Sequence, residues 1–430
     1  MNKFLNISKN NFFSQILIVA SGNVLARAIG IISLPLITRL YTSDQFGVFT
    51  TFLSYFTILS SITTLRYFVP VTIAKSEREA GYLIKLCFSI AGVFFVISFL
   101  FFSFLGNEIS FLINEPSVQD FLFILPFLLL FKGVFDPLRS FVIRKQQFKK
   151  LTNVLVVQSS LSAITKVVMG YAGIKKFGLF LGLISQHFVG VVFLLFSFRK
   201  HLILFFKNSN YKDIQSVAKR YKKFPLIQTW SSFLLVFSNQ LPIIFLGFLF
   251  DNSIVGLFGL AIGMVSLPIN LVGQSVGDVF YGKISSLGID KAFEIRLLAK
   301  STLIKISLIA IIPAMVLIFF GEDLFSFAFG EKWLKSGTYA SSLTILIFFR
   351  FIVSPFGGVF NLFEKQFSQL WLNVLKILLV FSVFLIARQI GLTSENTILL
   401  YSLVMPIHSL VVLGLIFKIT SKTYNINNNE

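Results

Sequence analysis

Four positively charged residues lie deep inside apolar stretches of this chain, where a charge is expensive unless an anion or water compensates it. They are Arg27, Lys132, Lys166 and Arg350. Arginine binds carboxylates and phosphates through two parallel hydrogen bonds, whereas lysine acts as a point charge. These residue types predict electrostatic recognition of an anion inside a membrane protein, with each cation facing a bundle interior or a water-filled cavity.

Arg27 lies inside the apolar run Ser14–Ile37, about 15 residues from its start and therefore roughly 20 Å into a bilayer. Asn23, Arg27 and Gly30 follow at i, i+4 and i+7, so they share one polar, small helix face. We expect this face to meet an anionic substrate. The alternative is a structural ion pair between Arg27 and Asp136 across the bundle.

Arg350 begins a polar stripe with Ser354, Gly358 and Asn361 at helical spacing, and Lys166 follows two serines at helical spacing. Each of these cations could instead be paired structurally, or extend its flexible side chain to the membrane surface. That structural interpretation is preferred for three cations nearer the ends of their helices, namely Arg66, Lys305 and Lys376.

Asp136 is an acidic residue inside a predicted apolar helix, four residues after Lys132. Residues at this spacing meet on one helix face, so we expect Asp136 to neutralise Lys132. The alternative role for Asp136 is a protonation site coupled to an ion gradient.

The composition shows what kind of element holds these residues. The chain has 430 residues, of which 55% are hydrophobic and 13% charged, with a mean hydropathy of +0.84. This is typical of an all-α polytopic membrane protein. A single cysteine, Cys87, excludes a disulfide framework, and three scattered histidines give no metal-ligand spacing. We expect the net charge of +20 to reflect an excess of lysine and arginine in cytoplasmic loops. It is not interpreted as a nucleic-acid-binding surface.

Apolar runs long enough to span a bilayer, which takes about 20 residues, recur twelve times. The first run has no small-x-small cleavage site, so we interpret it as a retained helix and not as a signal peptide. The predicted spans are 14–37, 46–69, 82–104, 120–138, 153–173, 178–198, 225–248, 255–280, 301–320, 339–362, 370–387 and 397–417.

Loop charges predict the orientation of these spans. An even number of spans places both termini on one side of the membrane. If the N-terminus is inside, the inside segments hold 25 lysines and arginines and the outside loops hold six. This asymmetry predicts that both termini are cytoplasmic.

The basic cytoplasmic segment 199–224 divides the spans into an N-terminal lobe, 1–205, and a C-terminal lobe, 206–430, with six helices each. We interpret the segment as a solvated linker; contact with anionic lipid headgroups is the alternative. Leu34–Phe49 and Leu241–Phe258 both contain Leu-Pro, an apolar helix end, a short polar turn and Gly-x-Phe. This similarity predicts an internal duplication with parallel repeats.

The first helix, the turn RLYTSDQFGVF (Arg39–Phe49) and the stretch VGLFGLAIGMVSLPINLVGQSVGDVFYGKIS (Val255–Ser285) resemble the polysaccharide-transport family. These are Wzx-type O-antigen and capsule flippases of the multidrug/oligosaccharidyl-lipid/polysaccharide exporter superfamily. The resemblance covers essentially the whole chain. It implies two six-helix lobes around a central cavity. It also implies translocation of an undecaprenyl-pyrophosphate-linked oligosaccharide from the cytoplasmic to the periplasmic leaflet of the bacterial inner membrane.

Within that family resemblance, the buried cations would attract the pyrophosphate while polar cavity residues would contact sugar hydroxyls. The same polar residues could instead form hydrogen bonds between helices. The expected partners are the lipid-linked oligosaccharide, membrane lipids and other polysaccharide-assembly proteins. The candidate residues are Arg27, Lys132, Lys166 and Arg350 for the substrate, Asn23, Asn270 and Gln274 for the cavity, and Asp136 for ion coupling.

Two other classes of protein are alternatives to a flippase. A multidrug-extrusion antiporter of the same superfamily would need buried acids for cationic substrates. A membrane polysaccharide polymerase or ligase would need a large periplasmic loop with catalytic residues. GIKKFG (Gly173–Gly178) does not match a phosphate-binding loop, and no pair of carboxylates is placed for glycosyl transfer. We therefore expect no enzymatic activity and no cofactor.

Overall fold

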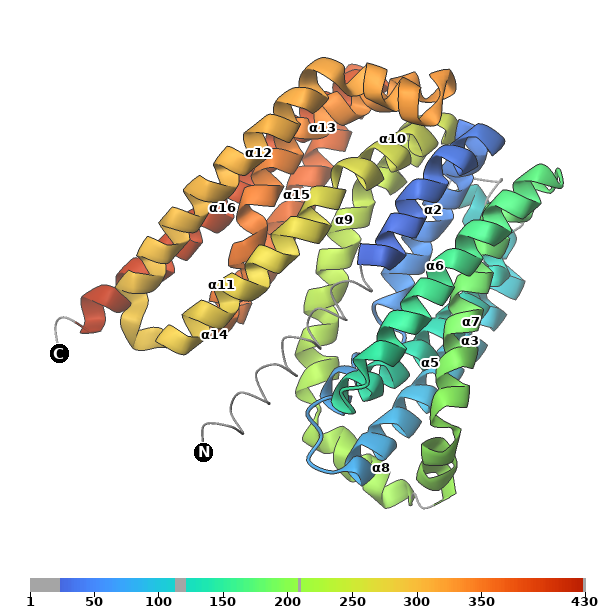
Figure 1. Cartoon of the computed structure of the whole chain (residues 1–430), viewed down its shortest axis with the longest axis vertical. Coiled ribbons are helices and arrows are strands. Elements are labelled where there is room, and N and C mark those ends of the chain that lie inside the picture. Colours follow the sequence, from blue (N-terminus) through green and yellow to red (C-terminus); the bar gives the residue numbers. More distant parts are fainter. Residues whose placement is uncertain (1–23, 113–120, 208–209, 428–430) are drawn as a thin grey trace. The chain divides into compact units, whose positions relative to one another are not determined.

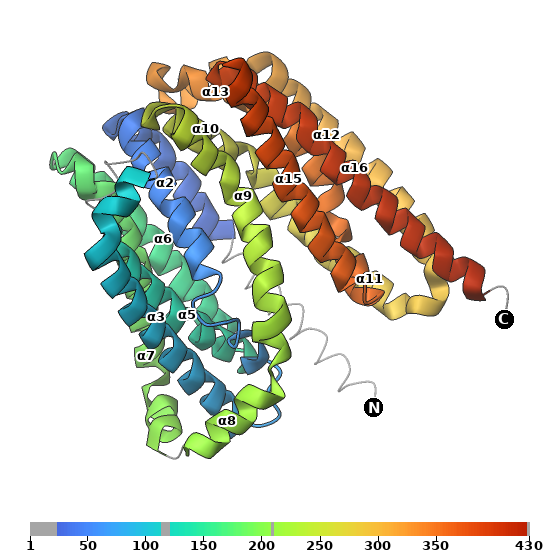
Figure 2. The ribbon, with the colours of Figure 1, turned by 180° about the vertical axis from the view of Figure 1, so that it is seen from behind.

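The structure, a computed structural model, describes residues 24–112, 121–207 and 210–427. Across these residues the chain is helical and contains no β-strand, which confirms the all-α prediction. The chain divides into two compact units, Met1–Val236 and Phe237–Glu430. Figures 1 and 2 show the helices from opposite sides. This division falls later than residue 205, where counting six helices per lobe predicts it. The two six-helix lobes around a cavity stay a prediction.

The first unit begins with a helix over residues 24–40. A short 3-10 turn, η1 (Val69–Val71), and a π-helical turn, η2 (Phe224–Gln228), interrupt the longer helices. Helix α9 begins in this unit and ends in the second. The α-helices are α2 (Ser43–Ser60), α3 (Glu77–Leu112), α5 (Ile124–Arg144), α6 (Phe148–Tyr171), α7 (Lys175–Lys207), α8 (Tyr211–Arg220) and α9 (Thr229–Leu249).

The second unit contains long helices joined by short turns. Helices α12, α13 and α16 pack against one another, and Figures 1 and 2 show α12 and α16 running side by side. Its short turns are η3 (Ile269–Gly273), η4 (Ile289–Lys291), η5 (Glu331–Trp333) and η6 (Ser354–Gly357). Its α-helices are α10 (Asn252–Val265), α11 (Gln274–Leu287), α12 (Ala292–Phe329), α13 (Leu334–Val353), α14 (Gly358–Leu362), α15 (Gln366–Ile390) and α16 (Ser394–Asn427).

Every predicted span overlaps at least one helix of the described residues. Eight of the described helical segments are long and apolar enough to cross a membrane, so this is a multi-pass membrane protein. These segments are Glu77–Leu105, Phe148–Tyr171, Lys175–Lys207, Phe224–Leu249, Ile289–Phe329, Glu331–Leu362, Phe367–Ile390 and Ser394–Ser421.

Among the predicted spans, 46–69 and 255–280 are not continuous α-helices, and the prediction of one uninterrupted helix is wrong for each of them; the span 339–362 is also interrupted, by η6. Helix α2 ends at Ser60, and Leu65 and Arg66 follow with φ of 47° and 56°. These are left-handed angles that non-glycine residues rarely adopt. Helix α10 ends at Val265 and is followed by the π-helix η3. The break after Val265 lies next to Pro268, which cannot donate a helical hydrogen bond, whereas no glycine or proline marks the break after Ser60.

The two turns that suggested a duplication are built alike. The Thr42 hydroxyl accepts from the Gln45 backbone N–H (3.3 Å), and the Gln45 side chain accepts from the Thr42 N–H (3.2 Å). This reciprocal pair is a capping box. The Asp251 carboxylate accepts from the Ile254 N–H (2.8 Å) and caps α10 at the equivalent position, although Ile254 has no side-chain acceptor to complete a capping box. Helices α2 and α10, which follow the two similar turns, therefore both begin at a residue whose side chain caps the helix N-terminus.

The basic segment between the lobes is not a solvated linker, because it contains α8, which packs on the first unit. Val217 of α8 is buried. The Tyr67 hydroxyl donates to the Ala218 carbonyl (3.1 Å), and Arg220 pairs with the buried Glu79 of α3 (2.9 Å). Figure 1 shows α8 crossing the end of this unit beside α3. The segment is thus a structured part of the first unit.

The start of α3, the end of α5 and helix α8 meet at one end of the first unit. The charge count predicts that all three lie on the cytoplasmic side of the membrane. Arg144 donates to the carbonyls of Thr72 (3.3 Å) and Ala74 (2.7 Å). Lys145 pairs with Glu77 across 2.7 Å. The ends of α3, α5 and α8 therefore lie together, as the predicted alternation of spans requires.

Candidate anion-binding site

Two cations converge on one amide in the second unit. The Asn239 side-chain oxygen, on α9, accepts hydrogen bonds from Arg350 on α13 (3.4 Å) and from Lys376 on α15 (2.5 Å). These three residues form the Asn239 cluster. Lys376 is only 8% exposed, and Arg350 is half-buried. Three helices far apart in sequence are needed to bring the three side chains together.

The Asn239 cluster carries two positive charges without a carboxylate. Among the residues that the structure describes, no acid lies within ion-pair distance of Arg350 or Lys376. An amide oxygen supplies only a partial charge, so the two cations still repel each other. Burying charges is costly unless they are paired. The cluster is therefore suited to hold an anion between its two cations.

Helix α16 adds two polar side chains beside the cluster. Tyr401 is buried and lies in the field of Arg350. His408 lies in the fields of Lys376 and Arg350, and its buried Nε2 has no hydrogen-bond partner in the described part of the chain. His408 thus places a buried polar atom near the cluster that no described protein group satisfies.

Lys376 was missed by the sequence interpretation, which treated it as a structural cation near a helix end. Its contact with Asn239 spans 137 residues, so no local spacing reports it. The predicted stripe from Arg350 to Asn361 is also corrected. Helix α13 ends at Val353, and Ser354 begins the 3-10 turn η6. Arg350 is joined to a cluster across helices, not to a stripe along one helix.

In the first unit, Lys132 and Asp136 meet as their spacing predicts. The Lys132 ammonium lies 2.5 Å from the Asp136 carboxylate on α5, with the two side chains 29% and 12% exposed. This contact neutralises Lys132 within its own helix. Whether Asp136 also takes part in ion coupling stays a prediction.

Two further polar groups surround this pair. Arg66 lies in the field of Asp136, and its buried Nε has no hydrogen-bond partner among the described residues. His187 on α7 lies in the field of Lys132, and its buried Nδ1 is likewise unpartnered there. We call Arg66, Lys132, Asp136 and His187 the Asp136 cluster. The sequence analysis assigned Arg66 to a structural role near a helix end. The left-handed turn at Leu65 and Arg66 places Arg66 in the Asp136 cluster.

Lys166 does not join the Asp136 cluster through any described contact. Its ammonium lies over the ring of Phe49 on α2, 5.3 Å from the centroid, in a cation–π arrangement. Its side-chain stem occupies the space left by Gly182 of α7, where an added Cβ would lie 2.4 Å from Lys166 Cγ. Lys166 is thus directed into the interior of the first unit, and its role toward a substrate stays a prediction.

The other predicted residues are placed only in part. Arg27 is half-buried on the helix over residues 24–40, and Asn23 lies outside the described residues. Asn270 lies in η3, but its side chain is outside the described part. Gln274 is exposed at the start of α11. None of the contacts described above brings these residues to either cluster.

The fold is that of known transporters of one superfamily. The chain is similar to an inward-facing multidrug resistance MATE family transporter of the MOP superfamily (TM-score 0.73, 10% identity, 94% of this chain and 96% of that chain). It is similar to the lipid II flippase MurJ in an inward closed conformation (TM-score 0.68, 15% identity, 96% and 91%). It is also similar to a MOP superfamily transporter from Pyrococcus furiosus described by the reverse polarity of its binding pocket (TM-score 0.64, 11% identity, 96% and 95%).

A family model described as polysaccharide biosynthesis protein matches residues 36–338. The chain belongs to this family. No curated protein matches it.

Proposed function

We propose that this protein is a flippase for a lipid-linked oligosaccharide. It translocates an undecaprenyl-pyrophosphate-linked repeat unit from the cytoplasmic to the periplasmic leaflet by alternating access, without bond-breaking chemistry. Membership of a polysaccharide biosynthesis family and the transporter fold support this class of substrate. The observation that carries the proposal is the Asn239 cluster, with two cations and no acid among the described residues.

The chemistry of the substrate fits that cluster. A pyrophosphate carries at least two negative charges and several acceptor oxygens. A charge-assisted hydrogen bond contributes about 1.5–3 kcal/mol, so an anion bridging Arg350 and Lys376 would offset the repulsion between them. Arg27 and Lys166 would guide the same group along the first unit, and Lys132 would contribute only when its pair with Asp136 opens. Sugar hydroxyls would contact polar residues such as Asn23, Asn270 and Gln274, and the isoprenoid tail would remain in lipid.

The alternative is a multidrug-extrusion antiporter, which the likeness to MATE transporters favours. Cationic drugs need buried carboxylates. The Asn239 cluster has the opposite polarity, and Asp136 is already paired with Lys132. The fold alone does not separate the two functions, but the sign of the buried charge favours an anionic substrate. A polymerase or ligase would be an enzyme with a catalytic periplasmic loop, and the long helices joined by short turns give it no support.

The decisive experiment is deletion of the gene followed by analysis of lipid-linked intermediates and surface polysaccharide. We expect complete repeat units to accumulate on the cytoplasmic leaflet and surface polysaccharide to disappear. Complementation with the wild-type chain or with Lys222→Ala, which removes an exposed cation, should restore export. A deletion strain with normal surface polysaccharide, but with lost efflux of cationic drugs, would establish the antiporter instead.

The proposed location is the inner membrane, with both termini in the cytoplasm. Reporter fusions after Lys150 and Lys223 should report the cytoplasm, and fusions near Asn107 and Glu331 the periplasm. A periplasmic report from α8 would overturn this orientation. Other polysaccharide-assembly proteins are proposed as partners because a flippase must receive its substrate from the enzymes that build it.

A further inference from the structure

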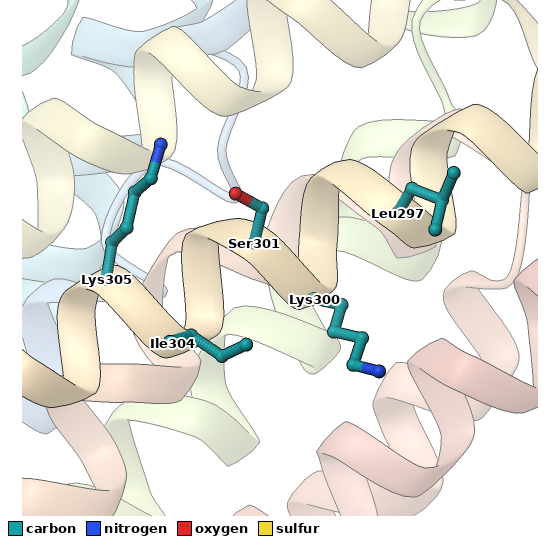
Figure 3. Close-up of a pocket in the computed structure, with 5 residues that line it drawn as sticks. All are labelled: Leu297, Lys300, Ser301, Ile304 and Lys305. Atoms are coloured by element: carbon teal, nitrogen blue, oxygen red, sulfur yellow. The ribbon is translucent and has the colours of Figure 1, made fainter.

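A hollow with two lysines opens on the surface of α12 in the second unit. Its lining, which we call the lysine hollow, consists of Leu297, Lys300, Ser301, Ile304 and Lys305, and the open space beside these residues measures about 290 Å³. In Figure 3 the Lys305 and Ser301 side chains point to one side of the helix and Lys300 to the other. Lysine stems are flexible, so both ammonium groups can reach an anion placed at the hollow.

Neither lysine of the hollow is neutralised. In the part of the chain that the structure describes, no carboxylate lies within ion-pair distance of Lys300 or Lys305. By contrast, Lys291, which directly precedes α12, is paired with Glu294 (3.2 Å). The hollow therefore presents two cations and a hydroxyl donor, which complement a phosphate.

The sequence of α12 fixes the depth of the hollow in a bilayer. Between Lys305 and Glu322 the helix has 16 consecutive uncharged residues. At about 1.5 Å per residue this segment measures roughly 25 Å, close to the thickness of a bilayer's hydrocarbon core, about 30 Å. Lys305 consequently lies at one edge of the hydrocarbon core, and Lys300 lies in the adjacent headgroup layer. This is the depth at which phospholipid phosphates are found.

An apolar stripe continues from the hollow along the same face of α12. Leu308, Ile312, Met315 and Phe319 follow Ile304 at intervals of three and four residues, and each is more than half exposed. Side chains at such spacing lie one above the other on a helix. This face of α12 thus has lysines at the depth of the lipid headgroups and apolar side chains at the depth of the acyl chains.

We propose that the lysine hollow binds the phosphate of an anionic phospholipid, whose acyl chains lie along the Leu308–Phe319 stripe. The occupant is a bilayer lipid and not a water-soluble phosphate, because a water-soluble phosphate has no acyl chains to contact the apolar stripe. This site is separate from the Asn239 cluster and does not depend on the proposed transport activity. By the charge count of the loops, the lipid belongs to the cytoplasmic leaflet.

The test is lipid binding to the purified full-length protein in neutral detergent, measured by native mass spectrometry. Phosphatidylglycerol and zwitterionic phosphatidylcholine of equal chain length are titrated separately. We expect wild type to prefer phosphatidylglycerol. A Lys near an anionic lipid surface contributes about fivefold in affinity, so Lys300→Ala with Lys305→Ala should lower phosphatidylglycerol binding by about 25-fold. Phosphatidylcholine binding should not change.

Matched variants separate the hollow from net charge. Lys283→Ala with Arg296→Ala removes two exposed cations near the same end of the unit and should leave the lipid preference intact. Lys300→Arg with Lys305→Arg should also retain it. Equal loss in the Lys283/Arg296 variant, or full retention in the Lys300/Lys305 alanine variant, would refute the site. Competition by glycerol phosphate as strong as that by phosphatidylglycerol would refute a lipid as its occupant.

Discussion

The Asp136 cluster of the first unit and the Asn239 cluster of the second treat their cations in opposite ways. In the first unit, the Asp136 cluster supplies a carboxylate 2.5 Å from Lys132. In the second unit, Arg350 and Lys376 share the amide of Asn239, and the described residues give them no carboxylate. A paired cation is neutral toward a ligand, whereas an unneutralised pair attracts anions. The difference makes the Asn239 cluster the stronger candidate for binding an anion, and ion coupling at Asp136 stays a prediction.

The largest effect is expected from breaking the second unit's cluster. Arg350→Ala or Lys376→Ala should abolish surface polysaccharide, since each lost charge-assisted hydrogen bond weakens binding by about ten- to a hundredfold. Arg350→Lys should keep part of the export, because the charge survives without the planar fork. Export is measured by complementation of the deletion strain, with membrane levels checked by immunoblot. Wild-type export by a stable Arg350→Ala protein would remove this residue from the substrate site.

Arg27 provides the next test, because it decides whether the first unit also meets the substrate. If it does, Arg27→Ala should reduce export by about tenfold, the value of one charged hydrogen bond. Arg27→Lys should restore part of it, and Asp136→Asn should leave most export intact. If Arg27 is instead a structural partner of Asp136, each single variant lowers protein level and the double variant recovers it. Recovery in that double variant would contradict a substrate role.

A smaller effect is expected on stability when the first unit's ion pair is broken. Asp136→Asn leaves Lys132 without its neutralising group and should destabilise the protein by about 1–3 kcal/mol, less than for a fully buried pair because Lys132 is partly exposed. Adding Lys132→Gln should recover much of that loss. Thermal unfolding of the purified protein in detergent measures both. Equal stability of Asp136→Asn and wild type would mean that the pair contributes nothing.

The smallest effect concerns the helix breaks. Leu65 holds a left-handed φ of 47°, which costs a non-glycine residue about 1–2 kcal/mol. Leu65→Gly should therefore be neutral or stabilise the first unit by up to about 1 kcal/mol. Leu59→Gly, inside α2, should destabilise it by about 1 kcal/mol or more. The same thermal assay compares them, and a Leu65→Gly protein as unstable as Leu59→Gly would show that the side chain matters more than the backbone.

Features that depend on neighbouring residues were predictable from sequence, and features that depend on distant ones were not. The twelve apolar runs and the Lys132–Asp136 contact follow from local hydropathy and from i, i+4 spacing. The joining of Lys376 to Asn239 does not, because the two residues are 137 positions apart. The break after Ser60 was not predicted either. The left-handed residues there are Leu65 and Arg66, and neither is a glycine, the residue type that usually signals a left-handed turn. The packing of α8 on Glu79 was missed because its basic residues resemble a solvated loop.

The Asn239 cluster also has a consequence for how the protein is made. Asn239 is synthesised more than a hundred residues before Arg350, and α13 and α15 enter the membrane as separate segments, each carrying one of the two cations of the cluster. A central arginine or lysine opposes insertion by about 3 kcal/mol, and an average apolar residue returns about 0.5. The stretch Leu343–Val353 contains nine leucine, isoleucine, phenylalanine and valine residues around Arg350, enough to insert the helix before its partner is met. These helices must therefore be strongly hydrophobic, because each has to insert into the membrane together with its cation before the cluster forms.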